Sequence, residues 1–209
     1  MKSSPAQIIQ EYGPFPGVDA VHGVTYDGRQ VWFATGDKLC ALDPASATVQ
    51  RSLPLTANAG TACDGAHLFQ IADDRIHKID PQSGRVLAAI PAPCADCSGL
   101  AWGEGALWVG GYKGRNIYQV DPETGQVLRT LACERFVTGV SWFGAELWHG
   151  TWEDGQSDLR QIDPQTGKVL QRLEMPEGMG VSGLEGDGRD RFYCGGGGSG
   201  RLRVVRKPA

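Results

Sequence analysis

Residues 98–111 read SGLAWGEGALWVGG, which is a glycine, a short apolar run, a turn and a second run that contains a tryptophan. Two such runs around a glycine-containing turn predict a β-hairpin. The same order of residue types recurs in four other segments, which begin at Gly23, Gly60, Gly139 and Gly183. These glycines and Gly99 are 37 to 44 residues apart, close to the roughly 40–45 residues of a four-stranded propeller blade. The spacing therefore predicts five blades.

Four of the five segments are followed by an Asp-Pro turn, and an alternating strand comes after it. The fifth segment ends with residues 201–205, and no fourth strand follows. Residues 7–12, before the first repeat, match the pattern of the missing outer strand. We therefore predict an all-β, five-bladed β-propeller with four-stranded blades, one domain over residues 1–209, whose last blade is closed by the N-terminal strand. Such closure leaves no long unpaired strand edge.

The composition narrows the classes of partner. Twenty Lys and Arg against 24 Asp and Glu give a net charge of −4, which argues against nucleic acid as a partner. No apolar segment reaches the length of about 18 residues that spans a membrane, and the N-terminus lacks the apolar run of a signal peptide. We therefore expect a cytoplasmic protein without a membrane partner, with its six cysteines mostly reduced. The sequence does not indicate an oligomeric state.

One aromatic residue stands at the same position of the second strand in each blade. A blade is covered on both faces, so these residues are expected to pack between neighbouring blades as scaffold. They are Trp32, Phe69, Trp108, Trp148 and Tyr193.

The repeat, with its D-P-x-[ST]-G-x-V continuation, resembles the propellers of streptogramin lyases, of the gluconolactonase and regucalcin group, and of plant-type glutaminyl cyclases. Residues 21–25, Val-His-Gly-Val-Thr, are similar to the Pro-His-Gly-Ile-Thr blade opening of streptogramin lyases. That family eliminates across a lactone ester with histidines, a glutamate and a magnesium ion. Of the functional residues of that family, this chain matches one histidine in its motif, His22.

The residue before each repeat glycine is expected to ring one mouth of the central channel. These residues are His22, Ala59, Ser98, Thr138 and Ser182, and four of them are polar. Ligands of propellers bind at such a mouth. His22 alone among them titrates near neutral pH, so it is either a catalytic or ligand-binding residue, for example a general base, or a solvated channel residue.

Glu185 occupies a position of the inner strand where the other blades have Thr25, Ala62, Ala101 and Ser141. A carboxyl group in a channel that holds little water has a raised pKa, and it can donate a proton or bind a divalent cation such as Mg²⁺ or Ca²⁺. A carboxylate that is simply hydrogen-bonded to water or backbone is the other interpretation.

The loops of the third and fourth blades bring aromatic and charged residues to the same face. Tyr112, Arg135, Trp152 and Glu153 are therefore predicted to bind a small molecule, together with Ser98, Thr138 and Ser182.

Thiols offer a different chemistry. Cys94 and Cys97 form a CxxC motif, and Cys133 lies in the corresponding loop of the next blade, so these three could bind a soft metal or an electrophile. The CxxC motif could also act in thiol exchange, and ordinary loop thiols are the third interpretation. His149 and Cys194 stand at equivalent positions of adjacent blades, where their side chains need not meet.

Three functions remain open. The first is a small-molecule lyase or hydrolase with His22 as the general base and Glu185 as an acid or metal ligand. The second is a propeller that binds a ligand or peptide at the same mouth without catalysis. The third is a metal or electrophile binder that uses Cys94, Cys97 and Cys133.

Overall fold

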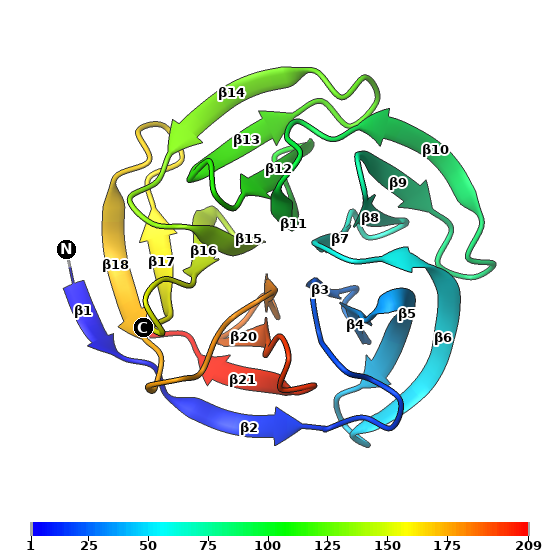
Figure 1. The fold of residues 1–209 in the computed structure, drawn as a ribbon, viewed down its shortest axis with the longest axis horizontal. Helices are drawn as coiled ribbons and strands as arrows, with labels where there is room; N and C mark the ends of the chain where they lie inside the picture. The colour runs from blue at the N-terminus through cyan, green and yellow to red at the C-terminus, as the bar shows by residue number, and fades with distance from the viewer. Residues whose placement is uncertain (1, 209) are drawn as a thin grey trace.

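The computed structural model describes residues 2–208, which form five sheets around one axis (Figure 1). This confirms the predicted all-β, five-bladed propeller. Residues 2–208 contain no helix that is long and apolar enough to cross a lipid bilayer.

In each blade the first strand lies nearest the axis and the others follow outwards. The first blade contains β3 (Val24–Tyr26), β4 (Val31–Ala34), β5 (Gly36–Asp43) and β6 (Thr48–Ala57). The second contains β7 (Thr61–Cys63), β8 (Leu68–Ala72), β9 (Arg75–Ile79) and β10 (Val86–Pro91). The third contains β11 (Cys97–Gly103), β12 (Ala106–Gly111), β13 (Asn116–Val120) and β14 (Val127–Ala132). The fourth contains β15 (Val137–Phe143), β16 (Glu146–Thr151), β17 (Asp158–Ile162), β18 (Val169–Glu174) and, outermost, β1 (Lys2–Pro5). The fifth contains β19 (Leu184–Gly186), β20 (Arg191–Gly195), β21 (Leu202–Arg206) and β2 (Ile8–Tyr12).

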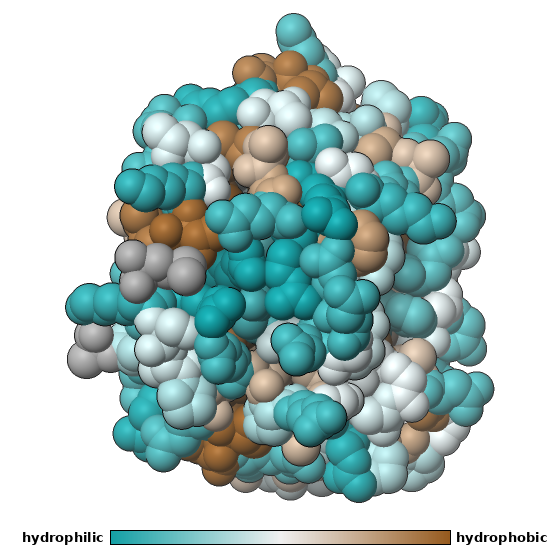
Figure 2. Space-filling view, turned by 60° about the vertical axis from the view of Figure 1, so that its left-hand side comes forward, coloured by the Kyte–Doolittle hydropathy of each residue, from teal (hydrophilic) through white to brown (hydrophobic). Residues whose placement is uncertain are grey.

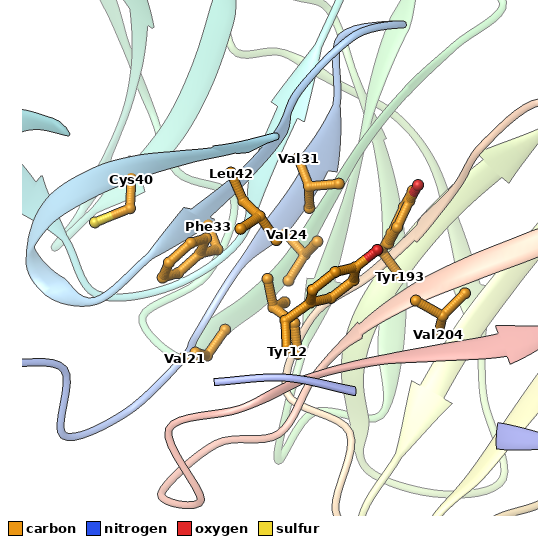
Figure 3. Close-up of a cluster of buried hydrophobic side chains, with 10 residues drawn as sticks. Tyr12, Val21, Val24, Val31, Phe33, Cys40, Leu42, Tyr193 and Val204 are labelled. Atoms are coloured by element: carbon orange, nitrogen blue, oxygen red, sulfur yellow. The ribbon is translucent and has the colours of Figure 1, made fainter. Parts of the chain in front are cut away.

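The N-terminal strand closes the ring, as the sequence predicts. β2 pairs with β21 in antiparallel register, with Tyr12 opposite Leu202. The ring of Tyr12 is buried where the last blade meets the first, in one cluster with Val24 of the first blade and with Tyr193 and Val204 of the last (Figure 3). Burial of an aromatic side chain of this size contributes on the order of 2–3 kcal/mol, so the seam is packed as well as hydrogen-bonded.

The first strand was not predicted. β1 pairs in parallel with β18, with Lys2 opposite Gln171 and Pro5 opposite Glu174. The fourth blade therefore has five strands, and the chain spans the seam between the last two blades (Figure 1). β1 is a four-residue edge strand that is mostly exposed, so it carries little hydrophobic pattern.

The five repeat glycines form a ring of backbone contacts around the axis. A Cβ atom on Gly99 would lie 2.6 Å from the amide nitrogen of Val140 in the next blade. The equivalent atom on Gly183 would lie 2.5 Å from the carbonyl oxygen of His22 in the first blade. Glycine is therefore required wherever an inner strand meets its neighbour, which explains why the repeat begins with it.

The five aromatic residues of the second strands are at most 4% exposed, which confirms their role as scaffold. They are Trp32, Phe69, Trp108, Trp148 and Tyr193. Two of them stack on an aromatic residue from the inner strand of the next blade: Trp102 stacks on Phe69, and Trp142 stacks on Trp108.

The outer strands leave a few apolar side chains exposed, for example Ile9 on β2 and Leu128 on β14. Figure 2 shows one flank of the ring, where hydrophobic residues form separate patches within a largely hydrophilic surface. Scattered apolar residues of this kind are ordinary, so they do not indicate a docking surface.

Candidate functional site

One end of the axis opens into a hollow with two adjoining sides, which we call the mouth hollow. The His22 side has a volume of about 360 Å³ and is lined by His22, Asn58, Ala59, Asp96, Cys97, Ser98, Tyr112, Thr138 and Ser182. The Arg203 side has a volume of about 400 Å³ and is lined by Tyr112, Thr138, Trp152, Val181, Ser182, Arg203 and two glycine-rich loops. Tyr112, Thr138 and Ser182 line both sides. The five positions before the repeat glycines therefore gather at this mouth, as the sequence predicts.

His22 presents a free imidazole to the hollow. Its side chain is half-buried, and its backbone N–H is fixed by a 2.8 Å hydrogen bond to the carbonyl of Ala34. Burial lowers the pKa of the imidazole below its ordinary value, and no charge or hydrogen bond from residues 2–208 contributes to that shift. The imidazole is therefore uncharged at neutral pH, and an uncharged imidazole can accept a proton.

The two serines of the mouth are tied into the scaffold. The Ser98 hydroxyl donates a 2.7 Å hydrogen bond to the carbonyl of Val137, and the Ser182 hydroxyl donates a 2.5 Å hydrogen bond to the carbonyl of Val21. The acceptors Val137 and Val21 belong to the segments that enter the following blade, directly before its mouth residue. These two hydroxyls therefore link neighbouring blades. Thr138 differs, because its Oγ1 is buried without a hydrogen-bond partner in the described part of the chain.

Two aromatic side chains form walls of the hollow. Tyr112 packs against Phe136 with their ring centroids 4.9 Å apart. Trp152 lies beside Gly180, where a Cβ atom would be 3.2 Å from the indole ring. Both residues were predicted from the loops of the third and fourth blades, and both line the Arg203 side.

The structure places Arg135 and Glu153 outside the mouth hollow. The Glu153 carboxylate is 2.5 Å from Arg115 and 3.3 Å from the Nε of Arg135. Arg135 also contacts the buried Asp158 at 3.3 Å. The opposite charges that the sequence brings to this face thus neutralise one another, because adjacent loops hold them within ion-pair distance.

Sequence reasoning missed Arg203. It lies on β21, it is 6% exposed, and among residues 2–208 it is the one charged residue that lines the Arg203 side. Its Nε donates a 2.8 Å hydrogen bond to Glu11 on the closing strand. The sequence did carry a signal for this residue. Arg203 stands between the apolar residues Leu202 and Val204 in a predicted strand, and an arginine among buried apolar residues is unusual.

Glu185 lies away from His22. His22 lines the mouth hollow, whereas Glu185 lines neither of its sides. Its carboxylate accepts hydrogen bonds from Thr25 at 2.9 Å and from Ser141 at 2.8 Å, so it joins the last blade to both of its neighbours. Burial raises the pKa of Glu185 to about 7, although these hydrogen bonds act in the opposite direction.

The donor set does not fit a metal ion. Residues 2–208 hold no group of three or more His, Cys, Asp or Glu side chains that could share one cation. Cys133 packs in a hydrophobic cluster between the third and fourth blades, whereas Cys97 packs in the cluster between the second and third. The predicted soft-metal site of Cys94, Cys97 and Cys133 is therefore not formed, because Cys133 faces a different blade interface.

His149 and Cys194 are both 1% exposed. The Nδ1 of His149 is 3.1 Å from the carbonyl of Gly150, and burial lowers the pKa of His149 to about 4. Burial also raises the pKa of Cys194 to about 12, so this pair is part of the core.

The fold and the open hollow define a five-bladed β-propeller with a pocket at one end of its axis. No protein-family model matches the sequence, and no curated protein matches it either. Among solved structures, the glutaminyl cyclase of Myxococcus xanthus is similar, with a TM-score of 0.79 and 19% identity over 98% of this chain and 97% of that one. The hydrazine synthase of Kuenenia stuttgartiensis is similar at a TM-score of 0.54 and 17% identity, over 85% of this chain and 56% of that one. At these identities the similarity shows the fold alone, and it confirms the predicted resemblance to glutaminyl cyclase propellers.

Proposed function

We propose that this protein is an enzyme that acts on an ester or amide bond of a small molecule in the mouth hollow, as a lyase or hydrolase. The observation that carries this proposal is the free imidazole of His22. It is neutral at neutral pH, it faces the hollow, and it is not engaged by a neighbouring charge. An enzyme that runs either reaction needs such a base.

His22 would accept a proton in the first step of either reaction. In hydrolysis, the imidazole takes a proton from water as the oxygen attacks the carbonyl carbon, and the leaving group then receives that proton. In elimination, the imidazole takes a proton from carbon while the ester oxygen departs. The similar propeller from Myxococcus xanthus is named a glutaminyl cyclase, and this name supports an enzymatic role.

The walls of the hollow indicate the class of substrate. Tyr112 and Trp152 offer flat apolar surfaces, and Arg203 offers a buried cation among otherwise uncharged residues. We infer a substrate that carries an aromatic or apolar group and a carboxylate or carbonyl, since guanidinium groups bind such oxygens well. Glu185 is left out of this mechanism, because it does not line the mouth hollow. No step is assigned to a metal ion, since the donor set does not fit one.

A screen of lactones, esters and amides, with glutaminyl peptides included, tests the proposal. The expected result is turnover of at least one compound that falls by about 10²- to 10⁴-fold in His22→Gln. His77→Gln is the matched control, because His77 is half-buried on β9 and lies outside the hollow. Turnover that survives in His22→Gln would refute the proposed base. Binding without turnover of any bound compound would favour the alternative, a non-catalytic ligand-binding propeller.

A further inference from the structure

Two thiols lie on one tight turn at the edge of the mouth hollow. Ala95 and Asp96 form a turn between β10 and β11, so the Cα atoms of Cys94 and Cys97 lie within about 7 Å of each other. Disulfides span this range. The Cys97 thiol donates a hydrogen bond to the carbonyl oxygen of Cys94, with a distance of 3.1 Å from Sγ to oxygen. The pair is therefore in place to bond without a change of fold.

The thiol pair is open to small molecules from solvent. Both cysteines are half-buried, and Cys97 lines the His22 side of the mouth hollow. Cys97 also lines a neighbouring hollow of about 440 Å³ with Asn58 and Asp73. A compact disulfide can therefore approach Cys97 from two directions.

Cys97 is the thiol of the pair that ionises first. Stabilisation of the Cys97 thiolate by the adjacent Cys94 thiol lowers the pKa of Cys97, and the same interaction raises the pKa of Cys94. The carboxylate of Asp96 acts against this, but its Oδ2 accepts a hydrogen bond of 2.6 Å from the amide of Lys113. By contrast, burial raises the pKa of Cys63 to about 11 and of Cys133 to about 12. The thiolate is the nucleophile in thiol chemistry, so Cys97 should react first.

We propose that Cys94 and Cys97 form a dithiol site that reduces small disulfides, with Cys97 as the attacking thiol and Cys94 as the resolving thiol. The Cys97 thiolate attacks one sulfur of the disulfide, a mixed disulfide forms, and the first thiolate leaves. Cys94 then loses its proton and attacks the Cys97 sulfur, which releases the second thiol. The disulfide gains two electrons and two protons, and the protein gains a Cys94–Cys97 bond. No step uses His22, so the proposal stands apart from the proposed enzyme function.

Oxidised glutathione is the probe that tests it. The reduced full-length protein is mixed with increasing concentrations of the probe, its free thiols are alkylated, and it is digested with trypsin. Residues 86–113 form one tryptic peptide that holds Cys94 and Cys97 and no other cysteine. The expected product is this peptide without alkylation and lighter by two hydrogen atoms. In Cys94→Ser the same peptide should instead retain one glutathione on Cys97.

Cys133→Ser is the matched control, since Cys133 is a half-buried thiol in the corresponding loop of the next blade. It should behave as the native protein does, and Cys97 should react about tenfold faster or more than Cys133. Full alkylation of the 86–113 peptide at every probe concentration would overturn the proposal. So would a native peptide that keeps glutathione, or a first reaction at Cys63 or Cys133.

Discussion

The carboxylate of Glu11 accepts a hydrogen bond of 2.8 Å from the Nε of Arg203. Glu11 lies on β2, the strand that closes the ring, and Arg203 lines the mouth hollow. Closure of the propeller therefore also positions the cation of the candidate site. Arg201 contacts the same carboxylate at 3.8 Å, so two guanidinium groups share one carboxylate. The positive charge that is left over favours an anionic ligand group at this position.

Arg203 should set the charge preference of the hollow. 3-Phenylpropionate is expected to bind more tightly than its uncharged amide, and Arg203→Gln should weaken its binding by about 10- to 100-fold, the value of one charge-assisted hydrogen bond. Isothermal titration measures both affinities, and circular dichroism confirms that the variant folds. Arg201→Gln is the control, because Arg201 shares Glu11 but does not line the hollow. Equal affinity for the acid and the amide would contradict the assignment.

Removal of residues 1–14 should expose the edge of β21 and uncover the seam that Tyr12 fills. The loss of a strand and of a buried aromatic side chain costs several kcal/mol, so the melting temperature should fall by about 10 °C or more. Removal of residues 1–6, which takes away β1 alone, should have a much smaller effect because β1 is mostly exposed. Calorimetry and light scattering report melting and aggregation. If the chain without residues 1–14 stays monomeric and its melting temperature is unchanged, β2 does not close the ring as described.

Gly99→Ala should disrupt the glycine ring. The new Cβ would lie 2.6 Å from the Val140 amide nitrogen, and backbone at the centre of a packed ring cannot move away. The expected loss in the free energy of unfolding is about 2 kcal/mol or more. Gly114→Ala is the matched control, since the nearest atom to its Cβ would be 3.5 Å away. Denaturant unfolding compares the two, and equal stability of both variants would show that the ring is looser than described.

Glu185 should make stability fall as pH rises towards neutrality. Its pKa is about 7 in the folded protein and 4.5 ordinarily, so between these values the folded state binds more protons than the unfolded state. The free energy of unfolding then decreases with pH, by on the order of 3 kcal/mol across the window. Glu185→Gln should therefore gain stability relative to the native protein between about pH 5 and about pH 8, as measured by denaturant unfolding. The control Glu177→Gln, at an exposed position, should not gain stability in this range. If the stability difference between Glu185→Gln and the native protein is the same at both pH values, the pKa of Glu185 is not raised.

The repeat made most of the fold predictable. Each blade requires a glycine that contacts the next blade and an aromatic residue that fills the space between blades. The spacing of these residues in the sequence therefore gives the number of blades. β1 was missed because four exposed residues at a sheet edge carry no such requirement. Its position depends on pairing with β18, far away in the sequence.

The mouth was also predictable, because residues next to the ring glycines have a fixed place. His22, Ser98, Thr138 and Ser182 therefore appear where the repeat puts them. The partners of charged loop residues were not predictable in this way. Arg135 and Glu153 neutralise each other across two loops, and Arg203 reaches the hollow from a strand.

Titration of His22 shows whether its imidazole is the free base of the mouth hollow. Two-dimensional NMR of the imidazole nitrogens, with His22→Gln to assign the signal, gives its pKa and its contacts with ligand. We expect a pKa below the ordinary 6.5, and a shift of both ring-nitrogen signals when a carboxylate ligand fills the hollow. A pKa at or above 6.5, or an imidazole that does not respond to a bound ligand, would contradict the assignment of His22 as the free base of the site.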